Sequence, residues 1–426
     1  MYIGVVGLWH LGCVISASWA KLGNNVVGFD YDIARVKNLN AGDPPLYEPG
    51  LKESLDEART AKKISFTNTI SDLSACDVVF LSYDTPVRDD DSTDATILTR
   101  SVNDLKKIMK DGSVLIISSQ SPAGFCRELR ALLQSTNSTL DIAYSPENLR
   151  LGEALQCYMK PGRIILGTAD VVTEKKCRAL FSQIEGDLLC MNLESAEVVK
   201  HGINSFLANS IVDANHLADI CEARGAAIDD VVKGMKSDPR IGARAYLAPG
   251  IGFSGGTLGR DLRVLQSINE SGTGYAKLFG LIHQLNGERK YAIVQRVKKI
   301  LGGLSGTTIA VLGATYKPGT STLRRSLPLE IIELLIAEGI TVNVFDPKAD
   351  YAELSAPPKF SICGSVLEAV KDADMVLLLT EWSEFKQIDW PTAKRSMKRS
   401  IIFDTKNLLD QKTLAEAGFT YYSVGR

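Results

Sequence analysis

Short apolar strands alternate with helical segments in two separate stretches of this chain, and this alternation restricts the fold more than any other feature. The chain opens with a strand over residues 2–7, a glycine turn, a helix over residues 8–22 and a strand over residues 25–30. Such a unit places its two strands parallel, with the helix packed on the sheet. Further strands are predicted at residues 77–82, 113–117 and 164–167. The first stretch therefore predicts a parallel sheet covered by helices on both faces.

A second stretch repeats the alternation in the last third of the chain. Strands are predicted at residues 307–313, 341–346, 374–380 and 400–404, with a helix over residues 327–338. This stretch contains no glycine-rich fingerprint, so a nucleotide bound there must be held in a different way.

Between the two stretches, an amphipathic segment over residues 195–224 predicts a helix of about 30 residues. A helix of this length is typical of a bridge between domains or of a subunit interface, and the pattern is equally compatible with a core helix. We predict an α/β fold in which two Rossmann-like, doubly wound parallel-sheet domains are joined by a long central helix or helical dimerisation domain. The predicted boundaries are 1–194, 195–300 and 301–426.

Composition excludes several classes of protein. Hydrophobic residues make up 45% and charged residues 23% of the 426 residues, a balance typical of soluble globular proteins. The net charge of −2 argues against binding along a nucleic acid. The N-terminus enters a strand at once, without the pattern of a signal peptide, and no apolar run approaches the ~18 residues of a membrane span. We therefore expect no nucleic-acid or membrane partner.

The cysteines and histidines do not predict a metal site. The eight cysteines contain no C-x-x-C pair and do not cluster with histidines. Buried free thiols in a reduced, cytoplasmic chain are the expectation. The four histidines are interpreted as packing or solvent-edge residues rather than as bases.

The first glycine turn resembles a dinucleotide-binding fingerprint with one altered position. Where G-x-G-x-x-G is expected, the chain reads Gly7-Leu-Trp-His-Leu-Gly12, so Trp9 replaces the glycine that lets a pyrophosphate approach the backbone. Asp30, at the end of the second strand, is a candidate acceptor for the hydroxyls of an adenosine ribose, which favours NAD over NADP. An ordinary turn between strand and helix is the alternative interpretation of this motif.

The segment Pro249-Gly-Ile-Gly-Phe-Ser-Gly-Gly-Thr-Leu-Gly-Arg-Asp261 resembles the active-site loop of the UDP-glucose/GDP-mannose dehydrogenase family. That family reads G-x-G-x-G-G-x-C-x-x-K-D there. Thr257 stands at the position of the family's cysteine nucleophile, Arg260 stands at its lysine, and Asp261 matches its aspartate. The glycines suit a loop that passes close to a ligand.

Other segments resemble the same family in the same order along nearly the whole chain, which implies the family's fold and ancestry. They are residues 42–51 (G-x-x-P-x-Y-E-P-G-L), 84–86 (G-T-P), 145–149 (N-P-E-F-L), 196–204 (A-E-x-x-K-x-x-x-N), 238–242 (D-x-R-I-G), 316–324, 345–347, 380–382 and 424–426.

The resemblance implies a chemistry and a set of residues. The family oxidises the C6 alcohol of a nucleotide hexose to a carboxylate with two NAD+, through an aldehyde trapped on cysteine. It implies that the cofactor here is NAD and that the substrate is a nucleotide sugar, most simply a UDP-hexose. The catalytic residues that it implies are Glu147, Lys200, Asn204, Thr257 and Asp261.

The resemblance assigns the remaining contacts as well. The NAD-binding domain would be 1–194, the central domain with the active-site loop 195–300, and the nucleotide-sugar-binding domain 301–426. Cofactor contacts are implied for Gly7, Leu8, Gly12, Asp30, Arg35, Thr85, Ser119 and Arg324. Substrate contacts are implied for Leu149, Arg240, Tyr246, Leu247, Gly255, Arg260 and Lys317. Arg240 would reach the site of a second subunit, which implies a homodimer.

The implied roles have ordinary structural alternatives. Lys200 and Asn204 would stabilise oxyanion charge, Asp261 would orient a water, and Glu147 would act as an acid or base. From spacing alone, Lys200 is also compatible with a solvated helix residue and Glu147 with a helix cap.

Several positions depart from the family. Leu151 stands at the family's second glutamate, and the family's S-T-V-P loop is Ser119-Gln-Ser-Pro122. Asp84 replaces a glycine and places a carboxylate near the expected pyrophosphate, which is repulsive unless Arg35 or Arg324 offsets it.

Three functions are compatible with these residues. The first is an NAD-dependent oxidoreductase on the C6 alcohol of a nucleotide sugar, in which Thr257 limits the reaction to one hydride transfer or imposes a route through a hydrated aldehyde. The second is a catalytically silent homologue that binds NAD or a nucleotide sugar. The third is a redox-assisted nucleotide-sugar epimerase.

Overall fold

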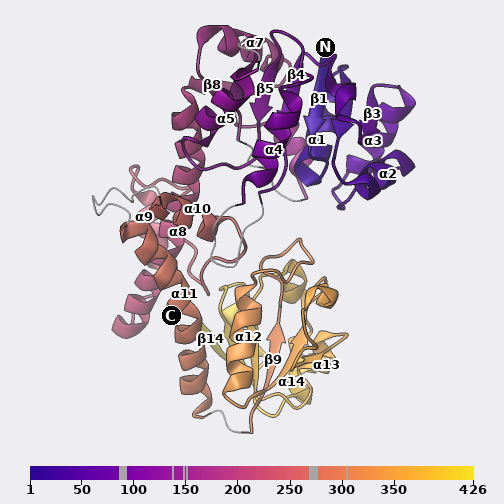
Figure 1. Ribbon diagram of the computed structural model, residues 1–426. Coiled ribbons are helices and arrows are strands. Elements are labelled where there is room, and N and C mark those ends of the chain that lie inside the picture. Colours follow the sequence, from indigo (N-terminus) through magenta and orange to yellow (C-terminus); the bar gives the residue numbers. More distant parts are fainter. Residues whose placement is uncertain (86–93, 137–138, 147–148, 150–151, 268–276, 304–305) are drawn as a thin grey trace. The chain divides into compact units, whose positions relative to one another are not determined.

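The computed structural model describes the chain except for residues 86–93, 137–138, 147–148, 150–151, 268–276 and 304–305 (Figure 1). Its contacts divide it into two compact units, Met1–Gly202 and Ile203–Arg426. The division into three domains at 194 and 300 stays a prediction.

The first unit contains an eight-stranded sheet in the order β3-β2-β1-β4-β5-β6-β7-β8. Its strands are β1 (Tyr2–Val6), β2 (Asn25–Phe29), β3 (Ile64–Thr67), β4 (Val78–Leu81), β5 (Val114–Ile117), β6 (Asp141–Tyr144), β7 (Arg163–Thr168) and β8 (Asp187–Met191). The helices are α1 (His10–Lys21), α2 (Ile33–Ala41), α3 (Leu51–Thr60), α4 (Thr96–Leu105), α5 (Phe125–Gln134), α6 (Ala154–Met159) and α7 (Val171–Phe181). The predicted α/β class is confirmed.

One pairing differs from the predicted parallel sheet. Strand β7 runs antiparallel to β6, with Tyr144 opposite Gly167, and β8 then runs parallel to β7. Among its described residues, the segment between β6 and β7 contains only the six-residue helix α6, in place of the longer helix of a full strand–helix–strand crossover.

The second unit contains a six-stranded sheet in the order β11-β10-β9-β12-β13-β14, and each of its neighbouring strands pairs in parallel. Its strands are β9 (Thr308–Leu312), β10 (Thr341–Phe345), β11 (Ser361–Ile362), β12 (Met375–Leu378), β13 (Ile401–Asp404) and β14 (Thr420–Ser423). The helices are α9 (Ile228–Ser237), α10 (Leu258–Ser267), α11 (Lys277–Leu301), α12 (Leu327–Ala337), α13 (Val366–Ala369), α14 (Trp390–Ser396) and α15 (Gln411–Glu416).

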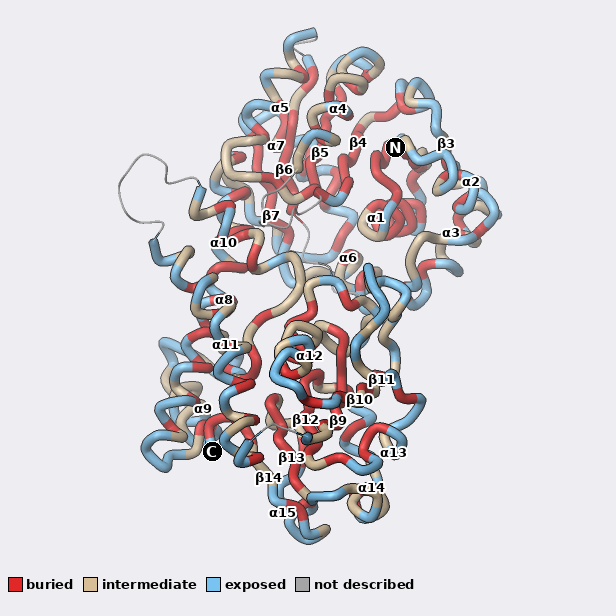
Figure 2. The backbone as a smooth tube through the Cα atoms, turned by 60° about the horizontal axis from the view of Figure 1, so that its bottom comes forward, coloured by how far each residue is buried: buried red, intermediate tan, exposed pale blue. Residues whose placement is uncertain are grey.

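The predicted central helix is α8 (Leu193–Arg224), which spans 32 residues and continues from the first unit into the second. The strands at the centre of each sheet are apolar and buried along their whole length, as β5 and β12 illustrate (Figure 2). This burial on both faces explains why these strands are continuous apolar runs rather than alternating patterns.

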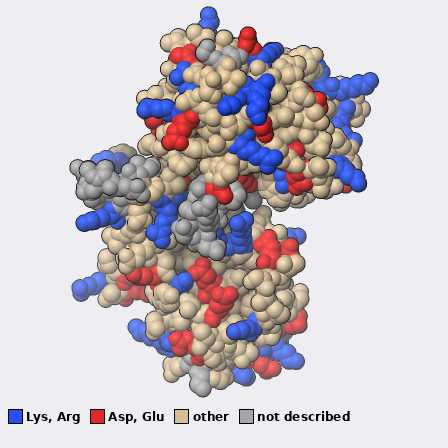
Figure 3. Space-filling view, viewed as in Figure 1, with Lys and Arg blue, Asp and Glu red and all other residues tan. Residues whose placement is uncertain are grey.

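The surface carries both signs of charge. On the face drawn in Figure 3, acidic and basic side chains are interspersed, in keeping with the net charge of −2. Among the helices that the structure describes, none is both long and apolar enough to cross a membrane.

Candidate active site

The turn after β1 depends on Gly7 and Gly12, the first and the last residue of the fingerprint. Gly7 has a φ of +96°, and a Cβ at Gly12 would lie 1.7 Å from the carbonyl oxygen of Gly7. The hydroxyl of Ser82, at the end of β4, donates to the carbonyl of Gly7 at 2.9 Å. The turn is therefore as tight as the sequence predicts, and it presents the N-terminus of α1 at the carboxyl ends of the strands.

Trp9 occupies the N-cap position of α1 in an extended conformation, with φ −79° and ψ −160°. Its side chain makes no capping hydrogen bond, and 37% of the residue is exposed. The guanidinium carbon of Arg35 lies 5.3 Å from the centroid of the indole ring, within the range of a cation–π contact. The position that the fingerprint reserves for glycine is thus covered by an indole and a cation.

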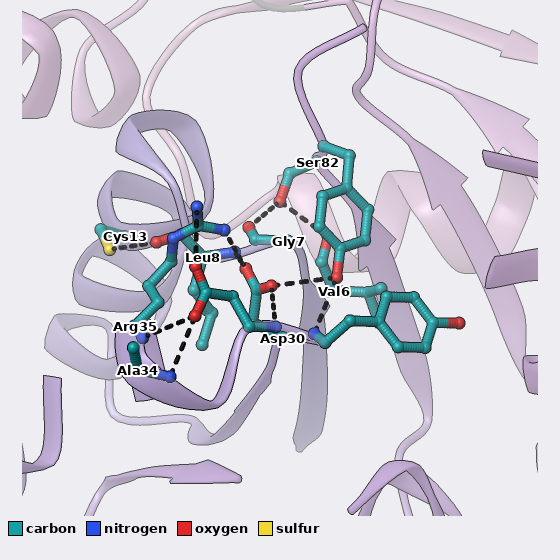
Figure 4. Close-up of polar contacts among 11 residues, drawn as sticks. Val6, Gly7, Leu8, Cys13, Asp30, Ala34, Arg35 and Ser82 are labelled. Atoms are coloured by element: carbon teal, nitrogen blue, oxygen red, sulfur yellow. Dashed lines mark hydrogen bonds and ion pairs between the residues drawn. The ribbon is translucent and has the colours of Figure 1, made fainter. Parts of the chain in front are cut away.

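Asp30 is almost completely buried at the end of β2, and protein groups already bond its carboxylate (Figure 4). The backbone amide of Leu8 donates to Oδ2 at 2.7 Å, and Nη1 of Arg35 donates to the same oxygen at 2.8 Å. The amide of Asp32 donates to Oδ1 at 2.9 Å. Asp30 therefore connects the glycine turn to the start of α2, and a ribose hydroxyl must share or replace the contact with Arg35.

Thr85 and Ser119 lie in the loops after β4 and β5. Thr85 is buried and donates its hydroxyl to the carbonyl of Gln120 at 3.1 Å, while Ser119 is buried and donates to the carbonyl of Leu81 at 3.2 Å. Each hydroxyl therefore bonds the backbone of a neighbouring segment and so holds the loops after β4 and β5 together. Asp84, directly before Thr85, is exposed.

The first unit fits the adenine half of a dinucleotide. A side chain at Gly12 would fill the cradle of the turn, and α1 has neither an acidic residue in its first turn nor a side-chain cap. The positive end of this helix is therefore uncompensated among its own residues, which suits a pyrophosphate.

Asn204 and Asp261 form the centre of the candidate site in the second unit. Nδ2 of Asn204, on α8, donates to Oδ2 of Asp261, which lies in the first turn of α10. Asp261 is 0% exposed, and Nε of Arg260 lies 3.7 Å from its Oδ1. Amide and guanidinium together offset the cost of burying this carboxylate.

Thr257 is exposed and directly precedes α10. Its carbonyl accepts a hydrogen bond from the amide of Asp261 at 3.1 Å, which begins the helix. A thiol at this position would have its thiolate stabilised by the helix N-terminus, whereas a threonine hydroxyl stays protonated near neutral pH.

Lys200 and Glu147 are the two remaining predicted catalytic residues. Lys200 lies one turn before Asn204 in α8 and is 9% exposed, so it is not a solvated helix residue within this chain. Glu147 lies outside the described residues, as does Leu151, whereas Leu149 is half-buried.

The predicted substrate residues lie mostly in the second unit. Gly255 has a φ of +81°, and a Cβ there would approach the ring of Tyr316 to 3.1 Å. Nζ of Lys317 lies 5.6 Å from the centroid of that ring. Leu247 is buried, and beside it burial and the nearby Glu381 raise the pKa of Tyr246.

Two predicted arginines are exposed. Arg240 is exposed and pairs with Asp238 of the same chain at 2.7 Å. Arg324 was predicted as a cofactor contact, and it is exposed in the second unit, whereas the other predicted cofactor residues lie in the first.

Two buried glutamates escaped the sequence analysis, although both lie in segments that resemble the family. Glu48 accepts hydrogen bonds from the amides of Gly152 and Ala154, and its Oε2 lies 2.9 Å from Nε2 of His10. Glu197 contacts the loop after β5. Only their place within motifs singles them out, because nothing in local periodicity marks a glutamate as buried.

Family models match three consecutive parts of the chain. They are the NAD binding domain of the UDP-glucose/GDP-mannose dehydrogenase family over residues 1–185, its central domain over 194–288 and its UDP binding domain over 310–411. NAD as the cofactor is thereby confirmed.

Similar proteins cover the whole chain. The UDP-glucose 6-dehydrogenase of Rickettsia typhi is 33% identical over 432 residues, which cover 100% of this chain and 99% of that protein. A UDP-glucose dehydrogenase from Pyrobaculum islandicum superposes with a TM-score of 0.88 at 27% identity, over 99% of this chain and 96% of that one. The UDP-D-ManNAc dehydrogenase of Pyrococcus horikoshii gives a TM-score of 0.87 at 25% identity, over 100% and 99% of the two chains. The chain therefore belongs to the UDP-glucose/GDP-mannose dehydrogenase family of NAD-dependent oxidoreductases.

Proposed function

We propose that the protein oxidises the C6 alcohol of a UDP-hexose to the aldehyde with one NAD+, and that Thr257 limits it to this single hydride transfer. The observation that carries the proposal is the exposed hydroxyl of Thr257 at the start of α10, four residues before the buried pair of Asp261 and Asn204. Lys200 and Asn204, the residues proposed to stabilise oxyanion charge, match the family's motif, whereas Thr257 stands at the position of the nucleophile for the second oxidation.

The proposed step needs no nucleophile. The C6–H bond breaks and its electron pair leaves as hydride, which bound NAD+ accepts, while the O–H proton passes to a base. Lys200 and the amide of Asn204 are suited to stabilise the developing alkoxide. Asp261 accepts from that amide and so holds its orientation.

Without a thiol, the aldehyde is not captured covalently. In the family chemistry, capture on cysteine gives a tetrahedral carbon whose hydride can leave. A threonine hydroxyl is too weak an acid to add at neutral pH, and its methyl group adds bulk beside the substrate carbon. A slow second oxidation through the hydrated aldehyde, with Asp261 acting on water, belongs to the same proposal.

For the substrate, we assign the sugar to Tyr246 and Leu247, the phosphates or ribose to Lys317, and further contacts to Gly255, Arg260 and Leu149. The match of residues 310–411 to a UDP binding domain and the names of the relatives support UDP as the nucleotide. The match of residues 194–288 to the family's central domain supports a separate central domain in addition to the two α/β domains.

We also propose a homodimer in which Arg240 contributes to the site of the second subunit. Arg240 projects from an exposed segment, and α8 carries the exposed side chains of Phe206 and Ile220. Large exposed apolar side chains on a long helix favour a subunit interface.

All eight cysteines are free thiols, which supports a reducing compartment such as the cytoplasm.

A catalytically silent NAD-binding or nucleotide-sugar-binding homologue is the second candidate, and Trp9 favours it. Its indole and Arg35 cover the turn where a pyrophosphate would approach the backbone. The buried pair of Asn204 and Asp261 favours the enzyme instead, because it suits charge stabilisation in a reaction.

The test mixes the protein with NAD+ and a panel of UDP-, GDP- and TDP-hexoses and counts NADH per sugar consumed. One NADH per sugar, with aldehyde trapped by a hydrazine, is the expected result. Two NADH and a uronic acid formed at a single rate would contradict the assignment to Thr257. If calorimetry shows that NAD+ binds at millimolar concentration but no NADH forms with any sugar, the protein is the silent homologue.

A further inference from the structure

Glu197 is a completely buried carboxylate on α8 that bonds a loop far away in the sequence. It is 0% exposed, and its two oxygens accept hydrogen bonds from two backbone amides in the segment that follows β5. Gly124 donates to Oε2 at 2.6 Å, and Cys126 donates to Oε1 at 2.9 Å. The hydroxyl of Ser121 lies 3.4 Å from Oε1.

These amides belong to the N-terminus of α5. Gly124 is its N-cap residue, with a φ of +91°, and Cys126 lies in its first turn. The carboxylate therefore takes the place of an N-cap side chain, where the helix dipole favours negative charge. Burial, together with the same charge, raises the pKa of the Cys126 thiol.

A second side chain of α8 holds the same loop. Nε2 of His201, one turn after Glu197, donates to the carbonyl of Ser121 at 2.9 Å. On the other side of the loop, Thr85 bonds the carbonyl of Gln120 at 3.1 Å. The segment of residues 119–126 is thus bonded both to Thr85, in the loop after β4, and to Glu197 and His201 of α8.

A purely structural cap for α5 would not need this arrangement. In the same unit, Asp170 caps α7 locally by accepting from Val172 and Thr173 at 2.8 and 2.9 Å. The cap of α5 comes instead from 73 residues away, three positions before Lys200. The contact fixes the loop to the part of α8 that carries Lys200.

We infer that Glu197 and His201 are positioning residues, which set the loop that carries Ser119 against the helix that carries Lys200. The inference rests on the proposed function, because it takes Ser119 as a cofactor contact and Lys200 as a catalytic residue. Every residue in the arrangement belongs to the first unit. Small errors in such geometry reduce rates strongly, since reacting groups must stay close to their productive positions.

Glu197→Gln is the test, because it keeps the shape of the side chain and removes the charge and one acceptor. We expect the dissociation constant of NAD+ to rise about tenfold and kcat to fall by at least as much, with UDP-sugar affinity unchanged. Amide hydrogen exchange at Gly124 and Cys126 should accelerate at a temperature where the protein is folded. Ser121→Ala, which removes only the weakest of the three contacts, should show the same changes at smaller size.

Asp170→Asn is the matched control, because it weakens a helix cap in the same unit. Arg130 lies 3.8 Å from Asp170 and also pairs with Asp141, the first residue of β6, so this cap lies away from the carboxyl end of that strand. The control should lower the melting temperature and leave NAD+ affinity unchanged.

The inference is overturned if Glu197→Gln lowers the melting temperature as the control does but leaves NAD+ affinity, kcat and exchange at the two amides unchanged. Failure of the proposed function is distinct, since it shows as absence of NADH formation by the unmodified protein. In that case exchange at Gly124 and Cys126, together with NAD+ affinity, still decides whether Glu197 fixes the loop.

Discussion

Asp346 holds in the second sheet the position that Asp30 holds in the first. Each ends the strand beside the central first strand, and each accepts from the backbone of the turn after that first strand, at 2.7 Å from Leu8 and 2.8 Å from Ala314. The turns match as well, since Gly7 and Gly313 have φ values of +96° and +94°.

The two carboxylates differ in what completes their bonding. Asp346 accepts from Nε1 of Trp382 at 3.1 Å, and that indole is buried. Asp30 accepts instead from Arg35, whose side chain is 23% exposed (Figure 4). A long charged side chain at the surface gives way to a ligand more easily than a packed indole does. This difference explains why the first sheet is suited to a dinucleotide and why the second must hold its nucleotide by other groups.

Replacing Trp9 with glycine should tighten NAD+ binding about tenfold, which corresponds to about 1.4 kcal/mol. The change removes the indole from the N-terminus of α1 and restores the approach of a pyrophosphate to the backbone. Stability should change little, because glycine is tolerated at an N-cap. Calorimetry measures the affinity, with Trp9→Ala as an intermediate. Weaker binding by Trp9→Gly would mean that the indole contacts the cofactor.

Thr257→Cys should add the second oxidation. A thiol directly before α10 gains acidity from the helix N-terminus and can capture the aldehyde. The expected change is from one NADH per sugar to two, with a uronic acid as product. Thr257→Ser is the matched control and should stay at one. If the cysteine variant still releases aldehyde, the limit on the reaction lies elsewhere, for example at Leu151.

The native cysteines should react slowly with iodoacetamide at pH 8. Burial raises the pKa of Cys13 and Cys177 to about 12 and that of Cys76 to about 11. At pH 8 about one in a thousand or fewer of these thiols is ionised, and the thiolate is the reactive form. The labelling rate should rise about tenfold for each pH unit below these pKa values, because the ionised fraction of the thiol rises in the same proportion.

Peptide mass spectrometry measures this labelling. Cys157, which is half-buried, serves as the internal reference, and in Thr257→Cys the new thiol should react before any native one. Fast labelling of Cys13 in the folded protein would contradict the packing of α1 against the sheet.

Gly12→Ala should destabilise the protein by more than about 3 kcal/mol, because the added Cβ would overlap the carbonyl oxygen of Gly7. Gly234→Ala is the matched control. Gly234 lies in α9 with open space where its Cβ would be, so alanine there should stabilise by about 0.5–1 kcal/mol. Urea unfolding measures both. Equal stabilities would mean that the fingerprint turn is not tight.

The local elements and the family follow from the order of residues along the chain. The pattern of apolar residues predicted β1, β2, β9 and β10 to within one or two residues of their observed ends. Strands β1 and β9 are apolar because they are buried over nearly their whole length, whereas β10 alternates between buried and more exposed residues. That Thr257, Trp9 and Asp84 stand where the family has other residues stays a prediction, which rests on the order of motifs along the chain.

Which polar groups meet could not be predicted from the sequence and is seen only in the folded chain. Three contacts depend on how separate segments pack. They are the bond from Arg35 to Asp30, the hydrogen bond from the amide of Gly124 to Glu197, and the antiparallel pairing of β6 with β7. A glutamate on a helix has the same local pattern whether it is solvated or buried. What distinguishes Glu197 is the pair of amides that offsets its desolvation, and these amides come from a loop 73 residues away.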